Sequence, residues 1–428
     1  MQSKKYYSTA KIVFAIFTAL LLTLPITAQP AQAQKFKVLH TFDGANGNGP
    51  TGVLVRDAAG NLYGTTEAGG MGKCGTYGCG TVFKLNKNGK QVWLHSFDIT
   101  DGEEPIEGLI RDAAGNLYGT ASLGGNSQCS NGAGCGVVFE LDSRGQESVL
   151  YKFKKPATGY QPESVLARDS AGNLYGVTRD GGKKSVGTVF KVDANGKETL
   201  LHSFTGGADG CTPVAGLILD ASGNLYGATA SGGLGVCDEG YGVVFKVDAA
   251  NGTLTVLYQF LPGDGAYPGS VLLLDETGNL YGTTEGGGSS SGCGSEGCGV
   301  VFELSPQTNG TWTEKVLYNF CSLSECNDGE EPKNGPLVRD SRGNLYGTTI
   351  FGGTSRNCNG RGCGTVFKLD TAGQETVLRS FEGQADGAVP AAGLVTDGSG
   401  NLYGVAQNGG DNSCNPPDGC GTVFKIIP

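Results

Sequence analysis

Short apolar runs separated by glycine-rich turns fill the sequence from about residue 35 onward. The first unit of this pattern predicts four strands, at residues 52–56, 61–66, 80–85 and 92–97. Between the first two lies the turn Asp57-Ala58-Ala59-Gly60, in which aspartate caps the turn and glycine accepts a positive φ. No segment keeps a 3.6-residue apolar period, so we predict no helix in this part of the chain.

The unit recurs seven times. The pentapeptide Gly-Asn-Leu-Tyr-Gly begins, without substitution, at Gly60, Gly115, Gly172, Gly223, Gly278, Gly343 and Gly400. Seven units of four short antiparallel strands predict an all-β, seven-bladed β-propeller, whose sheets carry apolar residues on both faces because each packs between two neighbours. The units are near residues 50–97, 105–153, 162–204, 213–260, 268–320, 332–381 and 390–427, the last completed by 36–42.

The two ends of the predicted domain, residues 34–428, are expected to pair. The last unit stops on its third strand, Phe424-Lys425-Ile426-Ile427, without a fourth. The missing strand has its match near the amino terminus, where residues 36–42 resemble residues 92–97. The amino-terminal strand therefore closes the ring and removes an open sheet edge.

Residues 1–33 are predicted to be a signal peptide. Lys4, Lys5 and Lys11 precede the apolar run 12–24, and Ala31-Gln32-Ala33 fits a small-residue cleavage site. The run is short for a membrane span, so we expect no direct span after removal of the signal and a secreted or cell-surface protein. Loss of the three lysines changes the net charge from −10 to −13, which argues against nucleic acid or an anionic membrane as partner.

All fourteen cysteines lie in the exported part, where an even number favours disulfides over metal sites. No paired C-x-x-C occurs and the histidines lie outside the cysteine loops, so we expect neither a metal nor a cofactor. Six local pairs leave Cys211 and Cys237 for each other. The predicted bonds are Cys74–Cys79, Cys129–Cys135, Cys211–Cys237, Cys293–Cys298, Cys321–Cys326, Cys358–Cys363 and Cys414–Cys420.

The repeated motif D-x-x-G-N-L-Y-G, a glycine-rich loop and G-[TV]-V-F-[KE]-[LVI] closely resemble the GloVer tandem-repeat proteins of bacteria over essentially all of residues 35–428. The resemblance implies a bacterial extracellular repeat protein with a choice-of-anchor segment at its carboxyl end and no established reaction. No such anchor precedes Pro428, which favours release or retention through a partner. A looser similarity, confined to D-x-x-G-N-L, connects the chain to NHL and streptogramin-lyase propellers.

A ligand is expected on the face that carries the variable loops. The loop leading into each unit contains the pattern [D/N/T]-G-x-x-P. Its aspartates could form an acidic crown that binds a cation or a basic partner. We favour the alternative, in which these aspartates serve only to form turns. These aspartates are Asp101, Asp209, Asp264, Asp328 and Asp386. The residue after the second strand also varies, which suggests polar contacts to a glycan. In successive units this residue is Glu67, Ser122, Arg179, Ala230, Glu285, Ile350 and Gln407.

No catalytic residue is predicted. Glu67 and Glu285 are a weak candidate for a paired-carboxylate hydrolase, because the required separation of about 5–10 Å is not established. His40, His95 and His202 share one register of the outermost strand, which favours a structural role. We therefore expect a monomeric binding or scaffold module for a polysaccharide or extracellular protein. The alternatives are a propeller-type glycan lyase or hydrolase and a structural component of the cell envelope or matrix.

Overall fold

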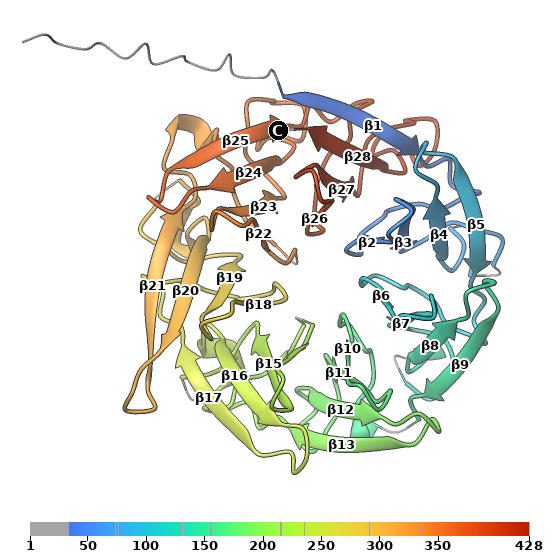
Figure 1. Cartoon of the computed structure of the whole chain (residues 1–428), viewed down its shortest axis with the longest axis vertical. Helices are drawn as coiled ribbons and strands as arrows, with labels where there is room; N and C mark the ends of the chain where they lie inside the picture. The colour runs from blue at the N-terminus through green and yellow to red at the C-terminus, as the bar shows by residue number, and fades with distance from the viewer. Residues whose placement is uncertain are drawn as a thin grey trace, which may run out of the picture. The chain divides into compact units, whose positions relative to one another are not determined.

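The computed structural model describes residues 34–427, except 73, 76, 130, 131, 155, 215, 235, 291 and 334. The predicted signal peptide and its cleavage site lie outside the described residues. Seven antiparallel four-stranded sheets form a ring, with the shortest strands innermost (Figure 1). The predicted all-β, seven-bladed β-propeller is therefore confirmed.

Blades 1 to 6 each place their strands in sequence order from the centre outward. Blade 1 contains β2 (Val55–Arg56), β3 (Leu62–Thr66), β4 (Thr81–Leu85) and β5 (Gln91–Ser96); blade 2 contains β6 (Ile110–Arg111), β7 (Leu117–Ala121), β8 (Val137–Leu141) and β9 (Glu147–Lys152). Blade 3 contains β10 (Ala167–Arg168), β11 (Leu174–Thr178), β12 (Thr188–Val192) and β13 (Glu198–Ser203); blade 4 contains β14 (Ile218–Leu219), β15 (Asn224–Thr229), β16 (Val243–Asp248) and β17 (Leu254–Gln259).

The remaining blades follow the same plan. Blade 5 contains β18 (Leu273–Leu274), β19 (Leu280–Thr284), β20 (Val300–Pro306) and β21 (Trp312–Asn319); blade 6 contains β22 (Val338–Arg339), β23 (Leu345–Thr349), β24 (Thr365–Leu369) and β25 (Glu375–Ser380). Blade 7 contains β26 (Val395–Thr396), β27 (Leu402–Ala406), β28 (Thr422–Ile427) and, as its outermost strand, β1 (Lys35–Thr41).

The pairing of β1 with β28 confirms closure of the ring by the amino-terminal segment. The strands are antiparallel, with Phe36 opposite Ile426 and Val38 opposite Phe424. Phe42, which follows β1, is fully buried against Phe83 of blade 1, with ring centroids 5.1 Å apart. The closing strand thus completes blade 7 and also links it to blade 1.

The innermost strands are shorter than predicted. The first was expected at residues 52–56, but only Val55 and Arg56 pair with β3. The preceding residues pack against the next blade instead, since a Cβ added at Gly52 would lie 2.5 Å from the carbonyl oxygen of Glu107. The narrow centre of the ring therefore uses this segment for contact between blades rather than for sheet pairing.

Each Asp-x-x-Gly-Asn-Leu-Tyr turn forms the same hydrogen-bond network. In blade 7 the Asp397 carboxylate accepts hydrogen bonds from the backbone amide and side-chain amide of Asn401 and from the hydroxyl of Tyr403. Desolvation raises the pKa of Asp397, but these hydrogen bonds and one from the Ser399 backbone amide outweigh it and lower the pKa to about 2. The invariant residues are thus explained by one local task, fixing the turn that starts the second strand.

Neighbouring blades meet through repeated aromatic contacts. Each fully buried phenylalanine after a fourth strand packs edge-on against the third-strand phenylalanine of the next blade. The seven pairs, with centroids 5.0–5.3 Å apart, are Phe42–Phe83, Phe97–Phe139, Phe153–Phe190, Phe204–Phe245, Phe260–Phe302, Phe320–Phe367 and Phe381–Phe424. Burial of each side chain stabilises the fold by about 1.5–3 kcal/mol, so the core is distributed between the blades rather than placed within one of them.

The only helices among the described residues are short 3-10 turns, which an apolar period cannot predict. They are η2 (Pro156–Thr158), η3 (Cys237–Glu239), η4 (Gly294–Glu296) and η5 (Ser324–Cys326). Across the described part of the chain, no helix has the length and apolar character needed to cross a membrane.

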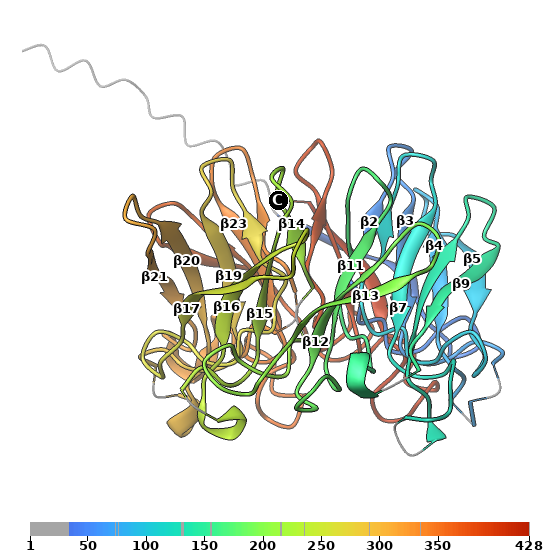
Figure 2. The same ribbon diagram turned by 90° about the horizontal axis from the view of Figure 1, so that it is seen from below.

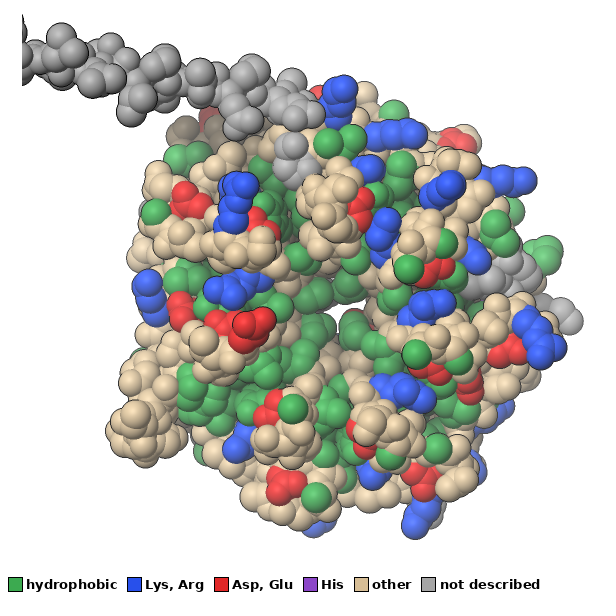
Figure 3. Space-filling view, in the orientation of Figure 1, with side chains coloured by type: hydrophobic (Ala, Val, Ile, Leu, Met, Phe, Trp, Pro, Cys, Tyr) green, Lys and Arg blue, Asp and Glu red, His purple; other side chains and the backbone are tan. Residues whose placement is uncertain are grey.

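The two faces of the ring differ. The loops between second and third strands (2–3 loops) and the loops that connect one blade to the next (inter-blade loops) lie at the bottom in Figure 2, with the 3-10 turns. The hairpin turns lie on the opposite face, where charged side chains of both signs surround a central opening (Figure 3). All seven predicted disulfides are formed, each involving a 2–3 loop or an inter-blade loop.

Candidate functional site

In every inter-blade loop, the residue immediately before the proline of the [D/N/T]-G-x-x-P pattern has a positive φ. A residue before proline usually favours extended backbone, so this conformation was not expected. Here φ is between +53° and +66°, although six of the seven residues are not glycine. The seven residues are Gly49, Glu104, Gln161, Thr212, Tyr267, Glu331 and Val389.

This backbone conformation is held by two hydrogen bonds in every blade. In blade 5, for example, the Tyr267 amide donates to the carbonyl of Tyr241 in the preceding 2–3 loop (2.9 Å). The Tyr267 carbonyl accepts from the amide of Glu285, the residue after the second strand (3.1 Å). Two residues that vary between the blades are thereby fixed beside each other. We call the fourteen residues so paired the inner loop ring.

One sector of this ring is rich in carboxylates. Glu67 and Glu104 belong to the inner loop ring, while Glu107 and Glu163 lie on the segments that run from the inter-blade loops to β6 and β10. Arg179 reaches Glu163 at 3.5 Å, and the Gln407 side-chain amide donates to Glu67 at 3.2 Å, joining blade 7 to blade 1. We call Glu67, Glu104, Glu107 and Glu163 the carboxylate sector.

Burial and mutual repulsion shift the protonation of the carboxylate sector. Desolvation and then the charge of Glu104 raise the pKa of Glu67, against the hydrogen bond from Gln407. Desolvation and the charge of Glu163 raise the pKa of Glu107 to about 8. Glu163 is also raised by desolvation, but Arg179 opposes the effect. Glu107 therefore carries its proton at neutral pH beside a carboxylate that is paired with a cation.

A second sector contains a depression of about 250 Å³. Tyr267 is the only aromatic residue of the inner loop ring, and Tyr241 lies next to it with ring centroids 6.4 Å apart. Burial, followed by the charge of Glu296, raises the pKa of Tyr267, so its hydroxyl stays protonated at neutral pH. We call this depression the tyrosine pocket. It is lined by Ala230, Tyr267, Glu285, Gly286, Glu296, Gly297 and Glu331.

Cations balance part of the acidity of the tyrosine pocket. Lys333 contacts Glu285 at 2.9 Å. Arg361 contacts Glu331 at 2.5 Å and also bonds the buried Glu330, while its guanidinium lies 4.0 Å from the ring centre of Phe351. The side chain of Glu296 has no hydrogen bond or ion pair among the described residues, so its carboxylate can accept a hydrogen bond from a ligand. The pocket thus combines an aromatic face, hydrogen-bond acceptors and donors within one small volume.

The structure brings together some of the predicted variable residues and separates others. Glu67 and Gln407 are hydrogen-bonded to each other, Ser122 donates to the Glu104 carbonyl at 3.3 Å, and Arg179 pairs with Glu163 of the carboxylate sector. Glu285 lies in the tyrosine pocket with Ala230. The weak candidate pair of Glu67 and Glu285 is therefore divided between two sectors, each carboxylate with a different partner.

The five aspartates of the inter-blade loops contact the outermost strands rather than the channel. Each approaches the fourth-strand residue of one register: Asp101 with His95, Asp209 with His202, Asp264 with Tyr258, Asp328 with Tyr318 and Asp386 with Arg379. Their other oxygens accept from backbone amides of the same loops. These contacts correspond to the turn-forming interpretation, and His95 and His202 share in them.

Sequence reasoning missed half of the inner loop ring and, apart from Ala230 and Glu285, the residues of the tyrosine pocket. A signal was present, since the residue before each proline varies between otherwise similar loops. Because residues before proline are usually extended, however, we did not expect these residues to adopt the positive φ that brings them beside the residue after the second strand. Glu107, Glu163 and Glu296 do not stand out in the comparison of the repeats. They approach the other site residues only because the folded ring places neighbouring blades side by side.

The comparisons with known proteins agree with this architecture. The family model described as the Gloeobacter/Verrucomicrobia repeat matches residues 26–133, 127–322 and 288–428. The chain therefore belongs to this repeat family. The corresponding search of curated protein sequences found no match.

Solved structures share the fold at low sequence identity. Virginiamycin B lyase from Staphylococcus aureus is 12% identical, with a TM-score of 0.57, covering 92% of this chain and all of the lyase. Oligogalacturonate lyase from Vibrio parahaemolyticus is 11% identical, with a TM-score of 0.52, covering 93% of this chain and 94% of the lyase. These similarities concern the propeller alone.

Proposed function

We propose that the protein is an extracellular binding module and that its tyrosine pocket recognises a polysaccharide. The observation that carries this proposal is Tyr267, whose backbone is held by two hydrogen bonds and whose side chain lines the pocket beside the carboxylates of Glu285 and Glu296. An aromatic face can cover the apolar side of a sugar ring, while carboxylates accept hydrogen bonds from its hydroxyl groups. Seven disulfides fit an oxidising extracellular environment.

The size of the pocket also suggests how a polysaccharide chain is recognised. A volume of about 250 Å³ suits one or two sugar units rather than a whole chain. A polysaccharide therefore presents one residue to the pocket, and its neighbours extend across the inner loop ring. The net acidity favours neutral or amino sugars over uronic acids.

The first test is a glycan-array screen of oxidised residues 34–428, with and without calcium, followed by titration of any hit. Tyr267→Ala is expected to weaken binding at least tenfold, equivalent to about 1.4 kcal/mol, whereas Tyr267→Phe retains the ring and most of the affinity. Tyr77→Ala is the matched control, because Tyr77 is an exposed tyrosine of the blade 1 2–3 loop. Equal binding by Tyr267→Ala and the parent protein contradicts the assignment. A blank array directs attention to a protein partner or a structural role in the envelope or matrix.

A second candidate function is glycan cleavage, which the carboxylate sector favours. Glu107 and Glu163 interact electrostatically, and their environments drive their protonation apart, as in acid–base pairs. The structural relatives named above include an oligogalacturonate lyase, although at 11% identity. In this alternative, Glu107 donates a proton and Glu163 accepts one, with Arg179 positioning Glu163.

Product analysis separates the two functions. A binding module returns the glycan intact, whereas an enzyme yields shorter products that Glu107→Gln abolishes without loss of binding. The Tyr267 variants report on binding whether the protein is a binding module or an enzyme, and the Glu107 variant reports on cleavage, so the two functions can be tested separately. An intact glycan after prolonged incubation with saturating protein excludes the enzymatic alternative for that glycan.

A further inference from the structure

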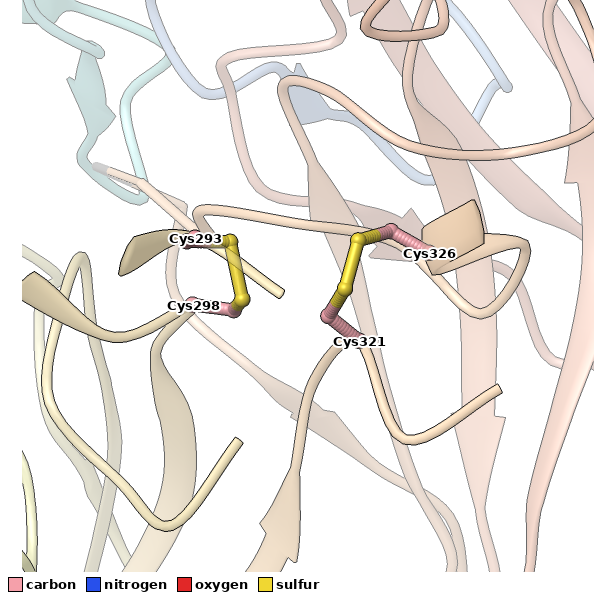
Figure 4. A group of neighbouring side chains, drawn as sticks. All are labelled: Cys293, Cys298, Cys321 and Cys326. Atoms are coloured by element: carbon pink, nitrogen blue, oxygen red, sulfur yellow. A yellow bond between two sulfur atoms is a disulfide. The ribbon is translucent and has the colours of Figure 1, made fainter. Parts of the chain in front are cut away.

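Two disulfides lie side by side at the junction of blades 5 and 6 (Figure 4). Cys293–Cys298 closes the 2–3 loop of blade 5, and Cys321–Cys326 closes the inter-blade loop that follows β21. The four sulfur atoms lie within 4.8 Å of one another. Among the described residues, no other group of three or more histidine, cysteine or acidic side chains is arranged in this way.

This arrangement matches the needs of a tetrahedral thiolate site. With a Zn–S bond of about 2.3 Å, the four sulfurs of such a site are about 3.8 Å apart, so movements of about 1 Å suffice here. Both pairs have four residues between the cysteines, which is within the spacing of structural zinc sites. We propose that, once both bridges are reduced, these four cysteines bind one zinc ion or a similar thiophilic metal ion.

Gly292 is what permits the two bridges to approach. A Cβ at this position would lie 2.1 Å from the Cys321 sulfur and 3.2 Å from the Cys326 sulfur. The glycine has no positive φ that would require it for backbone reasons. Close packing of the bridges is therefore a specific property of this junction. Cys358–Cys363 has the same spacing but belongs to no such group.

The site is accessible, and the chemistry balances. Cys293, Cys321 and Cys326 are partly exposed, while Cys298 is buried. Each bridge takes two electrons and two protons from a dithiol, which is oxidised to its own disulfide. The four resulting thiols release four protons as their thiolates bind one Zn²⁺. In the oxidised protein, each disulfide links two cysteines of the same loop. After reduction, the bound metal ion would link the two loops to each other.

The test uses stepwise reduction of oxidised residues 34–428 with a phosphine, which binds zinc weakly, in the presence of Co²⁺ as a spectroscopic probe. Mass spectrometry of alkylated peptides identifies which bridges are open at each step. We expect one Co²⁺ per chain, with the absorption of a tetrahedral tetrathiolate, once both bridges at this junction are open. Zinc is expected to displace the cobalt and abolish this absorption.

Two pairs of variants make the test specific. The spectrum should persist in Cys358→Ser/Cys363→Ser and be lost in Cys293→Ser/Cys298→Ser. Gly292→Ala, which retains every cysteine, should weaken Co²⁺ binding at least tenfold, whereas Gly398→Ala, at a glycine with open surroundings and ordinary φ, should not. The proposal is overturned when both bridges are mapped as open without the tetrathiolate spectrum, or when Cys293→Ser/Cys298→Ser retains it. It does not depend on the proposed polysaccharide binding.

Discussion

Replacing Asp397 by asparagine tests how strongly one turn network stabilises the ring. A pKa of about 2 against an ordinary value of 3.8 corresponds to about 2.5 kcal/mol of stabilisation at neutral pH. Because the carboxylate is partly exposed to solvent, screening reduces this to about 1–2 kcal/mol. The folded-state pKa is depressed, so this stabilisation is complete above the unfolded-state pKa and is lost as the pH falls from about 4 to about 2.

Urea denaturation of parent and Asp397→Asn proteins at several pH values measures this contribution. The difference in unfolding free energy should be about 1–2 kcal/mol larger at pH 7 than near pH 2. Asp418→Asn is the control, since Asp418 is exposed and its side chain has no hydrogen bond or ion pair in the described part of the chain. A difference between parent and Asp397→Asn that is the same at both pH values refutes the reasoning.

Two further predictions concern the backbone and the closure of the ring. Gly172→Val forces a branched residue to φ +86°, where a Cβ has room but the backbone is strained, so we expect a loss of about 1–3 kcal/mol in thermal or urea denaturation. Gly398→Val, at an ordinary φ, should change little, and unchanged melting of Gly172→Val contradicts the turn assignment. Deletion of residues 34–42 removes β1 and Phe42 and leaves β28 as an open edge, so size-exclusion chromatography should show self-association and melting should occur at lower temperature. A deletion protein as stable and monomeric as the parent excludes closure by β1 as a major stabilising contact.

The fold was predictable because its signals are local and repeated. Asp57, Gly60, Asn61 and Tyr63 each act within a few residues of one another, and seven copies remove the ambiguity of a single one. Closure was predictable for a related reason, since a missing strand at one end matched an extra strand at the other.

The candidate sites were predictable only in part. Residues after the second strand vary, and this variation located Glu67, Arg179 and Glu285 on the loop face. Nothing in the local sequence shows that Glu296 of one 2–3 loop faces Tyr267 of an inter-blade loop, or that Cys321 approaches Cys298. Such contacts depend on how neighbouring blades pack, and the phenylalanine pairs between blades are spread around the ring rather than confined to one segment.

The pairing of β1 with β28 also determines the order in which the molecule can assemble. Phe36 and Ile426 are 390 residues apart in the chain, so their contact is among the most remote in sequence that the fold contains. Bringing such distant segments together directly is slow, whereas each blade can form from contacts within about 50 residues. As six blades stack in turn, their packing brings the two ends together and removes most of the search. We therefore expect ring closure to be the final folding step, with β1 the last strand to find its partner.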